Sequence, residues 1–200
     1  MLKKLENFWY YYKNYLLVGC LLIIAVIIGI VSCANRGTYD MNILYMTHEY
    51  VDMTGQLDML FTGFVDDFNG DGVQNAQVIT INYGTTLKES QSAGATRSAN
   101  LASGKNVLFL VDEQNYNELK AGGFLQDISH LGTSQYLESD RFDAKNSGLL
   151  STIEGFSKTK SNYYLCVRTF DKERAKTDAE YAKKYDNAYA VIKNIIAFLG

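Results

Sequence analysis

The segment 15–34 constrains the fold most, because its sequence, YLLVGCLLIIAVIIGIVSCA, contains no charged side chain. A helix rises about 1.5 Å per residue, so a helical segment of this length spans about 30 Å, the thickness of a bilayer's hydrocarbon core. The segment therefore predicts a transmembrane helix. It divides the chain into a tip and transmembrane anchor (1–34), a connector (35–40) and a domain (41–200).

Charged and aromatic residues beside this segment predict its orientation. Lys3, Lys4 and Lys13 precede it, whereas Arg36 is the only basic residue close behind it. Because cytoplasmic flanks carry the excess of Lys and Arg, we expect a cytoplasmic N-terminus and an extracytoplasmic domain on a single-pass cell-membrane protein. The aromatic stretch 8–12 (FWYYY) suits a position at the headgroup boundary.

The end of the segment supports a second interpretation. Residues 30–33 (IVSC) fit the small-residue pattern that precedes the lipid-modified cysteine of bacterial lipoproteins. Residues 16–31 would then be the apolar core of a signal peptide, and Cys33 would carry the lipid after cleavage. An uncleaved anchor is favoured, since the polar, aromatic-rich stretch before the segment is long and bulky for a signal peptide. Both interpretations tether the domain outside the membrane.

Charge and composition exclude some classes of function. The net charge is −3, and since the first fifteen residues carry +2, the rest of the chain carries −5. An acidic domain is poorly suited to bind nucleic acid, whose phosphates attract Lys and Arg. Cys166 is the only cysteine after the apolar segment, so we expect no disulfide within the domain. With His48 and His130 as the only histidines, we expect no catalytic residues and no enzyme.

Alternating strand and helix patterns indicate an α/β domain. Apolar or alternating runs predict strands at 41–46 (MNILYM), 76–83 (AQVITINY), 106–111 (NVLFLV) and 163–170 (YYLCVRTF). Helical spacing of apolar residues predicts helices at 51–68, 87–103 and 179–199, with a short helix capped by Asp112 and a polar loop at about 132–160. The uninterrupted apolar third strand is typical of a strand covered on both faces. We therefore expect one three-layer domain with a mostly parallel sheet between helices.

The order of these elements resembles the first lobe of bacterial extracellular solute-binding proteins, the receptors of ABC importers. The resemblance rests on the strands MNILYM and AQVITINY, on NVLFLVD before a short helix, and on GFLQDIS at 123–129. It implies a solute-binding-protein-like lobe, outside the cytoplasm, in a small single-pass membrane-anchored form. Those receptors close two lobes around a solute, whereas residues 41–200 have room for one lobe.

One loop carries a calcium-binding pattern. Oxygen-bearing side chains alternate along it and a glycine follows, as in calcium loops. The candidate ligands are Asp67, Asn69, Asp71, the carbonyl of Val73, and Asn75. The twelfth position, where such loops have glutamate, is Val78, so Asp58 or Asp66 would have to supply the missing carboxylate. The pattern has two interpretations, a weak structural Ca²⁺ site and a plain turn between a helix and a strand.

These observations lead to three functional hypotheses. The first is a membrane-tethered binding or interaction module that contacts a membrane or cell-envelope protein and performs no catalysis. The alternative is a solute-binding component of an ABC importer, truncated or completed by a partner lobe. A cell-envelope hydrolase with a site in the loops after the strands is the weakest of the three.

Overall fold

The computed structural model describes residues 18, 22–24, 26, 39–49 and 53–199. Contacts divide the chain into two units, Met1–Thr38 and Tyr39–Gly200. In the first unit, the described residues are helical and each exposes more than half of its surface: Val18, Leu22, Ile23, Ile24 and Val26.

The predicted membrane anchor falls mostly outside the described residues. Only five positions of the segment 15–34 are described, and Cys33 is not among them. Within the described part of the chain, the structure has no helix that is both long enough and apolar enough to cross a membrane. The transmembrane and lipidation hypotheses therefore stay predictions.

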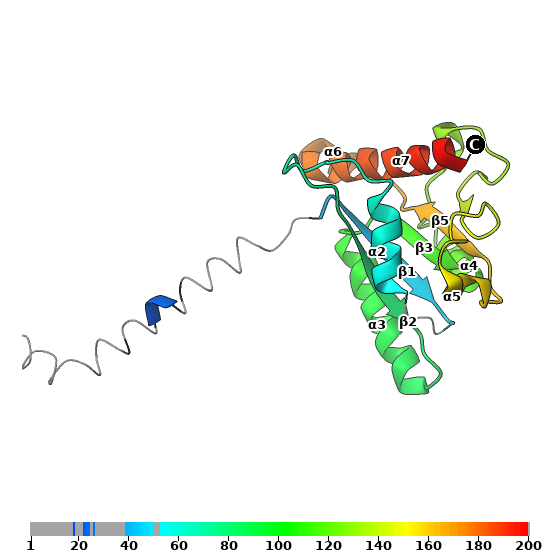
Figure 1. The fold of residues 1–200 in the computed structure, drawn as a ribbon, viewed down its shortest axis with the longest axis horizontal. Coiled ribbons are helices and arrows are strands. Elements are labelled where there is room, and N and C mark those ends of the chain that lie inside the picture. The colour runs from blue at the N-terminus through cyan, green and yellow to red at the C-terminus, as the bar shows by residue number, and fades with distance from the viewer. Residues whose placement is uncertain (1–17, 19–21, 25, 27–38, 50–52, 200) are drawn as a thin grey trace, which may run out of the picture. The chain divides into compact units, whose positions relative to one another are not determined.

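The second unit alternates strands and helices (Figure 1). Its elements are β1 (Met41–Thr47), α2 (Thr54–Thr62), β2 (Ala76–Asn82), α3 (Leu87–Ser103), β3 (Leu108–Asp112), α4 (Glu113–Ala121), the 3₁₀ helix η1 (Ser129–Leu131), β4 (Phe142–Asp143), α5 (Glu154–Ser157), β5 (Tyr163–Val167), α6 (Lys172–Thr177) and α7 (Ala179–Leu199). The domain is therefore α/β, as the sequence predicts.

The five strands form one mixed sheet in the order β2-β1-β3-β5-β4. β1 pairs in parallel with both β2 and β3, and Ile43 lies opposite Val78 on one side and Leu108 on the other. β5 runs antiparallel to both β3 and β4, so the prediction of a mostly parallel sheet is wrong for this half. Parallel neighbours need a long crossover connection, usually a helix. The only helix between β4 and β5 is the four-residue α5, and the chain returns antiparallel.

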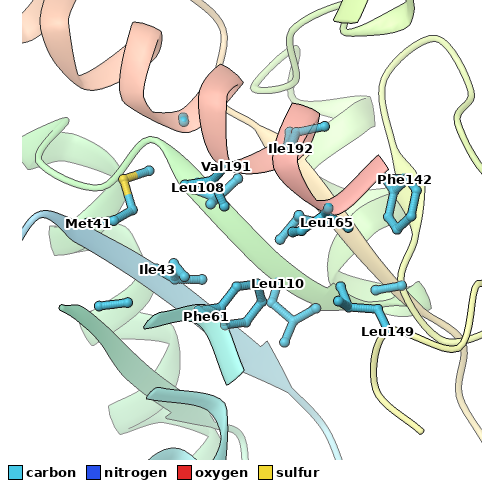
Figure 2. Packing of buried hydrophobic residues seen from close by; sticks show 14 of the residues in the cluster. Met41, Ile43, Phe61, Leu108, Leu110, Phe142, Leu149, Leu165, Val191 and Ile192 are labelled. Atoms are coloured by element: carbon cyan, nitrogen blue, oxygen red, sulfur yellow. The ribbon is translucent and has the colours of Figure 1, made fainter. Parts of the chain in front are cut away.

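Side chains alternate between the two faces of the sheet and build two clusters. On one face, residues such as Ile43, Leu108 and Leu165 pack against α2 and α7. Figure 2 shows this side of the core, with Phe61 of α2 and Val191 of α7 directed toward the strands. On the other face, alternate residues of the same strands pack against α3 and α4. Each central strand is thus buried on both sides, which explains its uninterrupted apolar sequence.

The outer edge of β2 is covered by polar side chains of α2. The backbone N–H of Val78 donates to Asp58 Oδ1 at 2.6 Å, and that of Ala76 donates to Thr62 Oγ1 at 3.1 Å. Thr54 Oγ1 lies 2.8 Å from Thr80 Oγ1. Four residues of helix rise about 6 Å, close to two residues of strand, so positions four apart on α2 match positions two apart on β2. Edge donors that would otherwise be free to pair with another chain are therefore satisfied.

The segment predicted as a polar loop, 132–160, contributes to the core. It contains β4 and α5, and its buried apolar side chains are Phe142, Ala144, Leu149, Leu150, Ile153 and Phe156. These residues follow no helical or strand period, because the chain changes direction every few residues. Periodicity therefore could not reveal that the segment covers the end of the sheet near β4 and β5.

Candidate functional site

The carboxyl ends of β1, β2 and β3 lie at one edge of the sheet, because the three strands are parallel. From β1 the chain goes through α2 to β2 on one side, and from β2 it goes through α3 to β3 on the other side of β1. The strand order therefore reverses between β1 and β3. In open α/β sheets such a switch point is the usual place for ligands. The cluster of polar and aromatic residues at this edge, called here the switch-point cluster, consists of His48, Tyr83, Arg97, Asp112, Asn115 and Glu118.

His48 and Asp112 form the centre of this cluster. His48 follows β1 directly, and Asp112 is the last residue of β3. Asp112 Oδ2 lies 2.6 Å from the backbone nitrogen of His48 and 2.9 Å from its Nδ1. The Asp112 side chain is 1% exposed and that of His48 is 27% exposed. With Nδ1–H donating to the carboxylate, the ring is fixed in orientation and Nε2 is left as its acceptor.

Asn115 and the start of α4 complete the bonding of Asp112. The other carboxylate oxygen, Oδ1, accepts from the backbone N–H and from the side-chain amide of Asn115, both at 2.9 Å. Asp112 thereby caps α4, as the sequence predicts. Asn115 Nδ2 also lies 3.2 Å from His48 Nδ1. The buried carboxylate thus holds β1, β3 and α4 together at the switch point.

Tyr83 and Arg97 form the second half of the cluster. The Tyr83 ring stacks on the His48 ring, with centroids 4.3 Å apart and 11° between the planes. Arg97 of α3 donates to the Tyr83 hydroxyl at 3.1 Å and forms an ion pair with Glu118 of α4. The hydrogen bond from Arg97, helped by its charge, lowers the pKa of Glu118, although partial burial opposes this. Burial raises the pKa of Tyr83, so its hydroxyl is neutral at physiological pH.

The hydrogen bonds of the cluster suit recognition. A partly exposed imidazole in a fixed orientation, an aromatic ring beside it and a guanidinium nearby offer an acceptor, a flat surface and several donors. Among the described residues, the His48 ring donates from Nδ1 to Asp112 and lies close to the Asn115 amide, and no hydrogen bond joins it to a hydroxyl or thiol. The arrangement can bind and orient a polar group.

A groove, called here the α3 groove, extends from this cluster along α3. It has a volume of about 600 Å³ and is lined by Tyr83, Gly94, Arg97, Ser98, Leu101, Ala102, Phe124 and Arg168. Arg168, which follows β5, donates from Nη1 to the carbonyl of Leu101 at 2.6 Å. The α3 residues that face the groove are mostly small, which leaves room between α3 and the side chains of Phe124 and Arg168. Arg97 therefore belongs to both the switch-point cluster and the groove.

The predicted calcium loop is tightly folded around Asp67. The Asp67 carboxylate accepts from the backbone N–H groups of Gly70 at 2.7 Å, Asp71 at 3.1 Å and Gly72 at 2.8 Å. Gly70 and Gly72 have φ angles of 79° and 83°, which other residues rarely adopt. The alternating oxygen side chains therefore stabilise the loop by accepting hydrogen bonds from its own backbone.

The side chains of Asn69, Asp71 and Asn75 also have partners. Asn69 Oδ1 accepts from the Asp71 N–H at 2.8 Å, and Asp71 Oδ1 accepts from the Val73 N–H at 2.9 Å. Asn75 exchanges hydrogen bonds with Asp40, which is buried.

The two acids proposed to supply a further carboxylate have other contacts. Asp58 accepts from Val78, and Asp66 Oδ2 lies 3.5 Å from Asn194 Nδ2. No group of three His, Cys, Asp or Glu side chains that could hold a metal ion occurs among the described residues.

The site that the structure assembles was not identifiable from the sequence. The sequence pattern indicates only a helix cap at Asp112, and it gives His48 no role. The two residues are 64 positions apart, and neither belongs to a short motif. The signal that could have found them is positional, since both stand at the carboxyl end of a predicted parallel strand.

Comparisons with known proteins identify no relative. No protein-family model matches the chain. Neither the curated proteins nor the solved structures gave a significant match.

Proposed function

We propose that the chain is a membrane-tethered, extracytoplasmic binding module that contacts a membrane or envelope protein through the switch-point cluster. The observation that carries the proposal is the pairing of His48 with the buried Asp112 where the strand order reverses. This is the position at which open α/β sheets bind their ligands. The proposal also keeps the resemblance of the domain to one lobe of a solute-binding protein.

The apolar segment supports the tether. It has the length and composition of a bilayer span, with the basic residues before it. The location is tested by thiol labelling of intact cells with a membrane-impermeant maleimide. We expect Lys193→Cys, at an exposed position of α7, to be labelled at once, and Lys4→Cys to be labelled only after lysis. The opposite pattern would contradict the proposed topology.

The state of Cys33 needs a separate measurement, the intact mass of the protein extracted from membranes. A mass equal to that of the full chain supports the uncleaved anchor. A mass that starts at Cys33 and includes a lipid supports the lipoprotein interpretation instead. Both interpretations tether the domain to the membrane. The mass therefore decides only whether the tether is a helix or a lipid.

Binding through the switch-point cluster is tested by photo-crosslinking in the native membrane. Gln114 is exposed on α4, and its side chain lies 3.4 Å from Glu118, the ion-pair partner of Arg97. A photo-reactive residue at Gln114 is expected to capture a defined protein. The same residue at Lys193, on α7 against the opposite face of the sheet, serves as the control. Equal capture from both positions, or none from Gln114, would contradict the proposal, and capture of a transporter subunit would favour the importer alternative.

A further inference from the structure

The α3 groove contains an arginine, Arg168, that has no acidic partner among the residues that the structure describes. Arg168 is half-buried, and its Nη1 donates to the Leu101 carbonyl near the end of α3. The ion pairs among the described residues do not include Arg168. A guanidinium has five N–H donors in a planar fork, and that fork matches a carboxylate in two parallel hydrogen bonds. The groove thus has one strong, directional site for an anion.

The rest of the groove is suited to an apolar body. Leu101 and Phe124 lie beside Arg168, and Tyr83 lies at the far end next to Arg97. Arg97 is already neutralised by Glu118. A volume of about 600 Å³ is within the range of pockets that bind small organic molecules. The charge and the lining together fit a molecule with one carboxylate and an apolar portion of modest size.

Gly94 provides a second, independent observation. It lies in the interior of α3, where glycine is unfavourable compared with alanine. A Cβ atom built at Gly94 would have no other atom within 4 Å, so no neighbouring side chain or backbone requires a glycine at this position. The helix backbone is instead open to the groove, where a ligand can approach it closely.

We propose that the α3 groove binds a small organic acid, with its carboxylate on Arg168 and its apolar part over Leu101 and Phe124 toward Gly94. This inference rests on the proposed binding function and deepens it, since Tyr83 and Arg97 line the groove and also belong to the switch-point cluster. It adds a small-molecule ligand class, bound in the groove beside the protein-binding cluster. The bond between Arg168 and Leu101 leaves most of the guanidinium donors available for the ligand.

The test uses the full chain in lipid nanodiscs and 3-(4-fluorophenyl)propanoate as the probe, followed by ¹⁹F NMR titration against empty nanodiscs. We expect saturable binding of the acid. The neutral amide of the same molecule should bind at least about tenfold more weakly than the acid, because it cannot form the charge-assisted pair. Equal binding of acid and amide, or no saturable binding of the acid, would overturn the inference.

Variants separate the charge from the shape of the groove. Arg168→Met should weaken acid binding about tenfold, whereas Lys172→Met, an exposed cation on α6, should leave it unchanged. Gly94→Leu should block the groove with Arg168 intact, whereas Gly94→Ala should still bind. If Arg168→Met destabilises the fold, Gly94→Leu still tests whether the acid binds in the groove. Undiminished binding in Gly94→Leu would overturn the inference.

The proposed function and this inference can fail separately. If the acid does not bind but Gln114 still captures a defined protein, the inference fails and the proposed function stands. If both the acid and the captured protein are absent, both fail.

Discussion

Asp112 Oδ2 contacts His48 twice, at 2.6 Å from its backbone nitrogen and at 2.9 Å from its Nδ1. One buried oxygen therefore fixes both the course of the chain after β1 and the orientation of the ring. The same carboxylate caps α4 through its other oxygen. The Asp112 carboxylate thus both orients the site and connects β1, β3 and α4.

Replacing Asp112 with alanine should destabilise the protein by about 2–4 kcal/mol, because the His48 and Asn115 N–H groups lose a buried acceptor. Glu113→Gln, at the exposed position next to it, should change stability by less than about 0.5 kcal/mol. Chemical denaturation of the full chain in detergent, followed by circular dichroism, measures both. Similar unfolding midpoints for the two variants would refute this role of Asp112.

The cover of the β2 edge predicts a local effect at Val78. Asp58→Ala removes the acceptor of the Val78 N–H and should cost about 1–2 kcal/mol, with faster hydrogen exchange at that amide. Asp58→Asn keeps a carbonyl acceptor and should have a smaller effect. Hydrogen exchange read by NMR at Val78 makes the comparison. An unchanged exchange rate in Asp58→Ala would show that α2 does not protect this edge.

Two glycines of α3 should respond oppositely to alanine. Gly94→Ala should stabilise the protein by about 0.5–1 kcal/mol, since the added methyl group meets open space and the helix gains propensity. Gly104, the C-cap, has a φ of 63°, and a Cβ there would lie 2.7 Å from Arg174 Nη1, so Gly104→Ala should destabilise by about 1 kcal/mol or more. Thermal unfolding of both variants tests the pair. A lower melting temperature for Gly94→Ala than for the parent chain would contradict the expected stabilisation.

The acid stability of the domain depends on Glu49. Partial burial acts to raise the pKa of this carboxyl, but hydrogen bonds from Ser161 and Lys160 outweigh it and lower the pKa below its ordinary value of 4.5. Because the folded-state pKa is the lower one, Glu49 stabilises the fold above the unfolded-state pKa. That stabilisation is lost as pH falls through the folded-state pKa.

Glu49→Gln should therefore flatten the fall in stability as the pH drops below the ordinary carboxyl pKa of 4.5. The measurement is the unfolding midpoint in denaturant as a function of pH. Glu180→Gln, whose side chain is 80% exposed on α7, is the control and should keep the slope of the parent chain. Identical slopes for Glu49→Gln and the parent would contradict the assignment.

The calcium prediction concerns the loop around Asp67. Loops of this kind in extracellular modules bind Ca²⁺ with dissociation constants of about 10⁻⁴–10⁻³ M. We expect weak binding by calorimetry, lost in Asp71→Ala and kept in Glu180→Gln, an exposed acid on α7. No heat at millimolar Ca²⁺, together with an unchanged melting temperature, would contradict the Ca²⁺ site and favour the plain turn.

The helices and strands that follow simple periods were predictable from the sequence. α3 and α7 were predicted as 87–103 and 179–199, the bounds that the structure gives them. Each has local signals, such as the capping box formed by Thr86 and Glu89. The three strands at the centre were also predictable, because a strand buried on both faces is apolar throughout.

The direction of β5 and the composition of the site were not predictable in this way. YYLCV is equally apolar whether its strand runs parallel or antiparallel to its neighbour, so the sequence does not encode its direction locally. Phe142 lies in a two-residue strand and Phe156 in a four-residue helix, and elements this short show no sequence period. The contact between His48 and Asp112 depends on the pairing of β1 with β3, which only the folded chain brings about.

The most direct test of the central claim is the yield of the Gln114 photo-crosslink after substitution of each histidine. His48→Ala removes the ring at the switch point, whereas His130→Ala removes a ring that contacts Tyr189 of α7. If the switch-point cluster is the binding surface, the yield should fall about fivefold or more in His48→Ala, since truncating a central contact costs about 1 kcal/mol or more, and should stay unchanged in His130→Ala. An unchanged yield in a folded His48→Ala protein would contradict the claim.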